Sequence, residues 1–185
     1  MKKLLLAASF VFGGSTFLSF VPDHSLQAEA KQKPLTKTIV KSLKKGTLPK
    51  AKGKIGSLRK NVKIKQNTNN YFYDPVQVKE TASNDVYVFN STKLTSKAKV
   101  TPNSKLVLIT RHYNYYMSDA SIKKHLGNKL KLKKAPQIYD ASEVSFYKVG
   151  KYYVCFDKMS QGYLSYTFVK VGTKKALADD YQMKF

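Results

Sequence analysis

Short apolar runs separated by turn residues dominate the chain from residue 70 onward. The runs are rich in Tyr, Val, Phe and Ile, which suit the half-buried surface of a β-strand. Gly, Pro, Asn and Ser fall between the runs, as expected of turns. Val149-Gly150-Lys151-Tyr152 indicates a tight hairpin, because Gly150 can adopt the positive φ that such a turn often needs. The sequence predicts strands at residues 86–89, 106–110, 137–139, 144–149, 152–156 and 163–169.

Helical periodicity is confined to two places. In residues 36–45 the apolar side chains Ile39, Val40 and Leu43 can share one helical face, and residues 119–130 form the other candidate helix. Many short strands with little helix predict a mainly β protein, of the small barrel or sandwich type.

The first 30 residues have the order of a secretory signal peptide. Two lysines precede an apolar stretch at residues 4–21, and Ala28-Glu29-Ala30 supplies the small–x–small site that signal peptidase cuts. A Gly-Gly-Ser-Thr interruption argues against an anchor helix, which needs about 20 largely apolar residues. The sequence therefore predicts cleavage after Ala30 and a secreted protein, either extracellular or associated with the cell surface.

Charge separates residues 31–65 from the rest of the chain. The chain has 34 Lys or Arg against 11 Asp or Glu, a formal net charge of +23. Thirteen of the basic residues, and no acid, fall in residues 31–65. Such a segment cannot easily bury enough apolar surface to offset its ordering entropy. We therefore expect a largely disordered basic arm, which could fold on an anionic membrane or wall polymer.

The net charge of +23 also predicts a polyanionic partner. Teichoic acids, anionic phospholipid, extracellular nucleic acid and host glycans are the candidates outside a bacterial cell. Nearly all of the positive charge comes from Lys, a point charge that lacks the planar fork with which Arg grips a phosphate. The composition favours diffuse attachment to anionic wall polymers, and no specific nucleic-acid site is evident.

Residues that could carry catalysis are few. Cys155 lies in the apolar run 152–156, where we expect a buried, inert thiol. His112 and His125 show none of the spacings of a zinc site, and no Gly-rich phosphate loop is present. The sequence predicts a non-catalytic protein with neither metal nor cofactor. Two alternatives stay open: a small basic hydrolase such as a nuclease, using His112, His125 and Glu143, and a cationic adhesin or membrane-active protein acting on host or competitor surfaces.

Three short motifs stand out in residues 136–171. They are Ile138-Tyr139-Asp140, then Gly150-Lys151-Tyr152-Tyr153-Val154 with an aromatic before a valine, and the run from Gly162 to Lys170, which reads glycine, aromatic and aliphatic, then aromatic, valine and lysine. Together they resemble the opening strand, the central strand and the closing signature of the bacterial SH3-like (SH3b) domains of secreted cell-wall proteins. The resemblance implies an SH3-like barrel unit at residues 131–185, with residues 66–130 as a degenerate first unit that lacks this closure.

The resemblance implies non-catalytic binding of peptidoglycan or another wall polymer. Tyrosines are the natural contacts, since an exposed ring gives an apolar platform and a hydroxyl at low entropic cost. Alternation in the last strand places Leu164, Tyr166 and Phe168 on one side, which we expect to be the core side. The candidate ligand-binding residues interleave charge with aromatic rings: Arg111, Tyr113, Tyr115, Tyr116, Lys151, Tyr152, Tyr153 and Tyr163.

Overall fold

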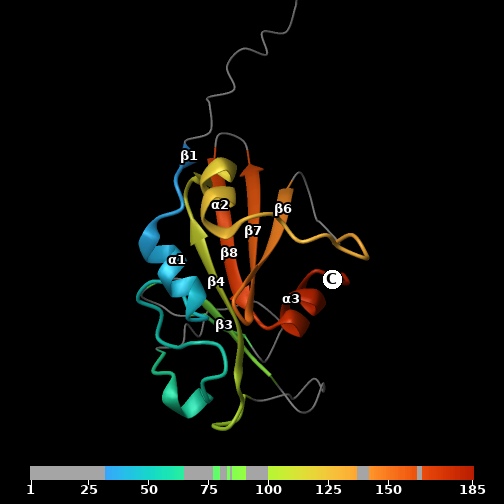
Figure 1. Ribbon diagram of the computed structural model, residues 1–185. Helices are drawn as coiled ribbons and strands as arrows, with labels where there is room; N and C mark the ends of the chain where they lie inside the picture. The colour runs from blue at the N-terminus through green and yellow to red at the C-terminus, as the bar shows by residue number, and fades with distance from the viewer. Residues whose placement is uncertain are drawn as a thin grey trace, which may run out of the picture.

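A six-stranded antiparallel sheet, in the order β2-β3-β4-β8-β7-β6, forms the centre of the computed structural model (Figure 1). The predicted signal peptide, the strand expected at residues 137–139 and Tyr163 lie outside the residues that the structure describes. For residues 77–79 and Gln161 it describes the backbone alone. The described residues are 32–64, 77–79, 83, 85–90, 100–136, 142–161 and 164–185.

The sheet and its helices confirm the prediction of a mainly β protein. A short parallel pair lies beside the sheet, formed by β1 (Gln32–Lys33) and β5 (Tyr116–Met117). The strands of the sheet are β2 (Gln77–Lys79), β3 (Val86–Phe89), β4 (Leu106–Tyr113), β6 (Ser142–Val149), β7 (Tyr152–Gln161) and β8 (Leu164–Gly172). The helical elements are α1 (Lys37–Lys44), the 3₁₀ turn η2 (Arg59–Asn61), α2 (Asp119–Leu126) and α3 (Lys174–Asp180).

The predicted hairpin and the two expected helices are present. Val149 pairs with Tyr152 across the turn between β6 and β7, and Gly150 has a φ of 63°. Helix α3 was not expected from the sequence. Its signal is short: Thr173 accepts a hydrogen bond from the Ala176 N–H as N-cap, and Leu177 is the buried residue of the helix.

Strands from both predicted β units belong to the same sheet. Strand β4, from residues 66–130, pairs over residues 108–113 with β8, from residues 131–185. The strand order ends at β2 and β6, and no pairing among the described residues joins these two edges. The described strands thus form one open sheet where one or two small barrels were expected. Strand patterning carries no information on closure, which depends on strand tilt and stagger.

Residues 32–64, which we call the N-terminal layer, are ordered against the sheet, contrary to the disordered arm that we expected. Thr36 caps α1 by accepting a hydrogen bond from the Ile39 N–H, a common helix start. The prediction failed because composition averages over all sides of a segment, whereas here the lysines point outward and the apolar residues point inward. The inward residues join one core: Leu35, Ile39, Val40, Leu43, Leu48, Ile55 and Val62.

The sheet is covered on both sides. On what we call the first face, the N-terminal layer and α2 pack over Val154 and Phe156 of β7. On the second face, α3 and the C-terminal residues pack over Tyr153 and Cys155 of the same strand. The alternation along β7 therefore supplies two apolar clusters, one on each face. No helix of the described residues is long and apolar enough to cross a membrane.

The core side of β8 is the opposite of the expected one. Thr167, Val169 and Val171 are buried, whereas Leu164 is 65% exposed and Phe168 is half-buried on the second face. Alternation correctly divided the strand into two sides, but the side that we expected to face the core was the wrong one. Val169 and Val171 lie on the same side of β8 as Thr167 and are buried with it. Two apolar β-branched residues on that side were the stronger sequence signal for the core.

Cys155 is fully buried on the second face, which confirms the expectation of a buried thiol. Its thiol donates a hydrogen bond to Tyr181 Oη at 3.3 Å, and the Tyr181 hydroxyl donates to Asp157 Oδ2 at 2.7 Å. Burial raises the pKa of the Cys155 thiol and also the pKa of Tyr181. A thiol in this environment stays protonated and is a poor nucleophile.

We expect the protein to lose stability as the pH rises above about 9, because unfolded Cys and Tyr ionise near pH 8.5 and 10 whereas Cys155 and Tyr181 have higher pKa values when folded. Their contribution to stability is complete below those unfolded values. Above them it falls, for each group, by up to about 1.4 kcal/mol per pH unit. Urea denaturation from pH 7 to 11 measures this slope. Cys155→Ala should fall less steeply above pH 8.5, and an unchanged slope would contradict the assignment.

Candidate functional site

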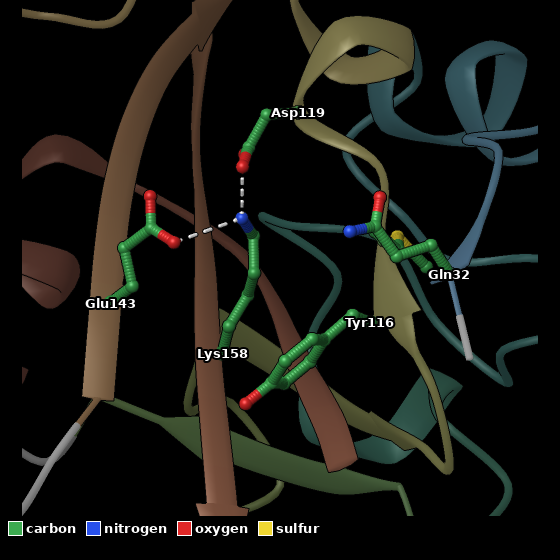
Figure 2. Close-up of a pocket in the computed structure, with 6 residues that line it drawn as sticks. Gln32, Tyr116, Asp119, Glu143 and Lys158 are labelled. Atoms are coloured by element: carbon green, nitrogen blue, oxygen red, sulfur yellow. Dashed lines mark hydrogen bonds and ion pairs between the residues drawn. The ribbon is translucent and has the colours of Figure 1, made fainter. Parts of the chain in front are cut away.

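A pocket of about 210 Å³ lies where β1 and β5 meet α2, β6 and β7 (Figure 2). The structure brings together side chains from five elements, which lie between residues 32 and 161 of the chain. The lining residues are Gln32, Tyr116, Met117, Asp119, Glu143 and Lys158.

Secondary structure fixes each charged residue of the pocket. Glu143 of β6 and Lys158 of β7 are direct partners in the antiparallel register, so their side chains share one face. Asp119 is the first residue of α2, whose N-cap Ser118 accepts a hydrogen bond from the Ser121 N–H. The β1–β5 pairing sets Gln32 beside Tyr116 on the other side of the pocket.

Lys158 forms ion pairs with both acids. Its Nζ donates to Glu143 Oε2 at 3.2 Å and to Asp119 Oδ2, while the Lys158 side chain is only 7% exposed. Burial opposes the charged form of Lys158, but the hydrogen bonds to Asp119 and Glu143 outweigh it and raise the pKa. The lysine is thus held as an ammonium and is unsuited to act as a nucleophile. Since two carboxylates face one ammonium, this charged centre has a net charge of −1.

A groove of about 690 Å³ adjoins the pocket and shares Asp119 and Glu143 with it. It runs beside α2 and the loop that follows the helix. Three exposed lysines line this groove: Lys123, Lys129 and Lys131. Negative charge at the pocket therefore gives way to positive charge along the groove.

The groove also contains a buried hydroxyl. Ser145 is 8% exposed, and its Oγ makes no hydrogen bond of normal geometry, although it lies near the Tyr147 hydroxyl. Buried polar atoms normally have a partner, so a hydroxyl in this state is available to a bound polar group.

Of the tyrosines predicted to contact a ligand, Tyr116 lines the pocket. Tyr115 and Tyr113 lie close by, with ring centroids 5.5 Å apart, and both are partly buried against the first-face core. Lys33 places its Nζ 4.6 Å from the centroid of the Tyr115 ring. Neither Tyr115 nor Tyr113 is among the residues that line the pocket.

Arg111, one of the predicted ligand-binding residues, makes structural contacts in the folded chain. Its guanidinium donates to Asp85 Oδ1 at 2.7 Å, to Asp85 Oδ2 at 2.6 Å and to the Pro49 carbonyl at 2.7 Å. Asp85 is completely buried, and its hydrogen bond raises the pKa of Arg111 further. These contacts fasten the N-terminal layer to β4 and use three of the five N–H donors of the guanidinium.

Lys151, Tyr152 and Tyr153 lie at the other end of β7. Tyr152 packs against the first-face core and against Gly46, where its ring leaves no room for a side chain. Tyr153 lies on the second face, with its ring centroid 5.0 Å from that of Phe185. Lys158 is six residues further along β7, about 20 Å away. The structure therefore does not join this group to the tyrosines near the pocket.

Asp119 and Lys158 of the pocket were not predicted from the sequence, and Glu143 was named only in the hydrolase alternative, although one further signal was present. In the predicted hairpin Val149 pairs with Tyr152. If the pairing is counted outward from there, Glu143 lies opposite Lys158, and the two residues form a pair of opposite charges on one face. Asp119 gave no such signal, since only the packing of α2 brings it to β7.

The residues of the hydrolase alternative do not converge. His112 stacks on Phe168 with ring centroids 5.0 Å apart on the second face, and burial lowers its pKa. Glu143 lines the pocket on the first face. In the part of the chain that the structure describes, no group of His, Cys, Asp and Glu side chains could hold a metal ion.

No protein-family model matches the chain, and a comparison with curated proteins finds no match either. Among solved structures, the chain is similar to a DUF4309 family protein, YjgB, from Bacillus subtilis subsp. subtilis strain 168. The two share 15% sequence identity with a TM-score of 0.44, and the match covers 75% of this chain and 95% of that one.

Proposed function

We propose that the chain is a secreted, non-catalytic protein that binds anionic polymers of the bacterial cell envelope. The observation that carries this proposal is the basic outer surface of the N-terminal layer, which contains no acid. Its lysines are all exposed: Lys33, Lys37, Lys41, Lys44, Lys45, Lys50, Lys52, Lys54, Lys60 and Lys63.

The layer holds these charges in fixed positions. On α1, Lys37, Lys41 and Lys44 follow one another at helical spacing on the exposed side, while Leu43 is buried beneath. None of the lysines of the layer forms an ion pair with an acid of the described residues. A preorganised row of unpaired ammonium groups can bind a linear polyanion with little loss of protein entropy.

The sequence supplies the remaining support. The predicted signal peptide at residues 1–30 supports secretion, and the similarity of residues 136–171 to SH3b domains supports a wall polymer as the partner. The SH3-like barrel stays a hypothesis, because the described strands lie in one open sheet.

The same layer disfavours a membrane-inserting role. Ile39, Val40 and Leu43, the apolar residues of α1, are 5%, 8% and 0% exposed because they already pack in the protein core. Insertion of α1 into a lipid bilayer would require the helix to leave that core. We therefore favour attachment by charge to a polymer over membrane insertion.

Replacing Lys37, Lys41 and Lys44 with Gln should weaken binding to purified cell walls that contain teichoic acid. Each Lys near an anionic surface contributes about 1 kcal/mol, so we expect a loss of roughly 10- to 100-fold at low salt. The salt dependence should also flatten, because fewer counterions are released. Co-sedimentation of the protein with walls, across a salt series, measures both effects.

The matched control removes the same charge from the other side of the molecule. Lys174, Lys175 and Lys184 are exposed on or beside α3, which packs on the second face. The Gln variant of these three lysines should bind nearly as well as the unchanged protein. Equal losses in both variants would show that net charge alone drives binding, and undiminished binding to walls stripped of teichoic acid would exclude that polymer.

A further inference from the structure

We propose that the pocket and its adjoining groove bind a zwitterionic segment of an envelope polymer, in which an ammonium group lies close to a phosphate or carboxylate. The best chemical match is a polyol phosphate that carries amino-acyl esters. This inference rests on the proposed function, because it names the kind of polymer that the protein would select.

The pocket offers acids that a ligand can reach. Lys158 occupies Oδ2 of Asp119 and Oε2 of Glu143, whose side chains are 60% and 70% exposed. The second oxygen of each carboxylate has no hydrogen-bond donor among the described residues. Both oxygens can therefore accept from a ligand ammonium, and the net charge of −1 at this centre matches one such group.

The other acids that the structure describes are engaged elsewhere. Asp85 is buried with Arg111, and Asp157 is buried with Tyr181. On α3, Asp179 and Asp180 pair with Lys175 and Lys170. Within the described residues, Asp119 and Glu143 are thus the acids that line a pocket in a chain with a net charge of +23.

The groove supplies the opposite charge at close range. Lys123 lies one helical turn after Asp119, a spacing that sets their Cβ atoms about 5–6 Å apart. Lys129 and Lys131 follow in the loop, and none of the three lysines pairs with a described acid. An anionic group beside the ligand ammonium would therefore meet these lysines.

The remaining lining groups suit the neutral part of such a ligand. Figure 2 shows the Tyr116 ring and the Gln32 amide on the side of Lys158 away from Glu143. The Ser145 hydroxyl adds a buried polar atom without a well-formed hydrogen bond. A ring, an amide and a hydroxyl can contact the carbon chain and hydroxyl groups of a polyol.

The arrangement discriminates against ligands of one sign. A simple cation is repelled by the net charge of +23, and an amine-free polyanion that enters the pocket meets Asp119 and Glu143. A ligand with both charges avoids each repulsion and forms both attractions. Selectivity obtained by repelling the wrong ligand is common in specific sites.

The test compares lipoteichoic acid that retains its D-alanyl esters with the same polymer after mild alkaline removal of the esters. Binding is measured by titration at constant salt. The hydrolysed polymer is more negative, so charge alone predicts that it binds more tightly. The zwitterionic site predicts the reverse, with the esterified polymer favoured by about 10-fold, as expected from one charge-assisted hydrogen bond.

Glu143→Gln should remove or reverse this preference, and it leaves Lys158 its partner Asp119. Asp119→Asn is the second variant and leaves Glu143 in place. Asp179→Asn is the matched control, since it removes an exposed acid from α3 and should keep the full preference. Competition by a soluble peptidoglycan stem peptide would support the same recognition chemistry with a peptide as the source of both charges.

Two failures can be told apart. If the unchanged protein binds neither polymer, the proposed function itself is wrong. If it binds both and prefers the hydrolysed one, polyanion binding stands and the zwitterionic site is overturned. A preference that survives in both Glu143→Gln and Asp119→Asn would also overturn the site.

Discussion

Residues 66–185 alone are expected not to fold cooperatively. Without the N-terminal layer, the first face of the sheet exposes Ile109, Phe156, Val169 and Val171, which are now completely buried. Burying one large apolar side chain contributes about 1.5–3 kcal/mol, and a whole domain is stable by only about 5–15 kcal/mol. Losing the layer therefore exceeds the available stability. Urea denaturation followed by circular dichroism should show a sharp transition for the longer chain and none for the fragment.

A single substitution in the N-terminal layer should cause a smaller loss of stability than deletion of the whole layer. Leu43 of α1 is 0% exposed, and Leu43→Ala should lower the free energy of unfolding by about 2–5 kcal/mol. The Gln variant of Lys37, Lys41 and Lys44 should stay close to the unchanged protein in stability. A fragment as stable as the longer chain would show that the layer is an appendage, as the sequence analysis expected.

Arg111→Met is expected to lower the free energy of unfolding by about 3–5 kcal/mol, because it leaves the Asp85 carboxylate buried without its cation. The Pro49 carbonyl also loses a donor, which loosens the N-terminal layer. Thermal and urea denaturation measure the loss. Arg111→Lys keeps the positive charge but not the planar fork of the guanidinium, so this variant should lose less stability than Arg111→Met.

The same pair of variants tests the two roles considered for Arg111. If Arg111 is structural, the folded Arg111→Lys protein should bind cell walls as well as the unchanged protein does. A clear loss of wall binding with little loss of stability would return Arg111 to the ligand-binding residues.

Local structure was predictable wherever the signal lay within a few residues. The alternation in β6 and β7 and the turn at Gly150 predicted a hairpin, and the hairpin implies the pairing of Glu143 with Lys158. The apolar face of α1 was also predictable from the spacing of Ile39 and Leu43.

Features that depend on distant parts of the chain were not predictable from these patterns. The structural contacts of Arg111 were not predicted, because its partner, Asp85, lies 26 residues away and gives no local sign of the pair. The layer looked disordered because the surface that buries Leu43 is built from strands that follow much later in the sequence. The pocket was not predicted for the same reason, because Asp119 contacts Lys158 only when α2 packs against the sheet.

The parallel pairing of β1 with β5 has a kinetic consequence. Gln32 pairs with Tyr116, and the Leu35 N–H donates to Ser121 Oγ, 86 residues further along the chain. Contacts of such long range slow folding, because the entropy of closing the loop is lost before the contacts form. During synthesis the N-terminal layer emerges before the strands of the sheet, so the surface on which it packs is completed only after β8. The basic segment must therefore wait as an unfolded chain, open to proteases and to any polyanion nearby, until the final strands arrive.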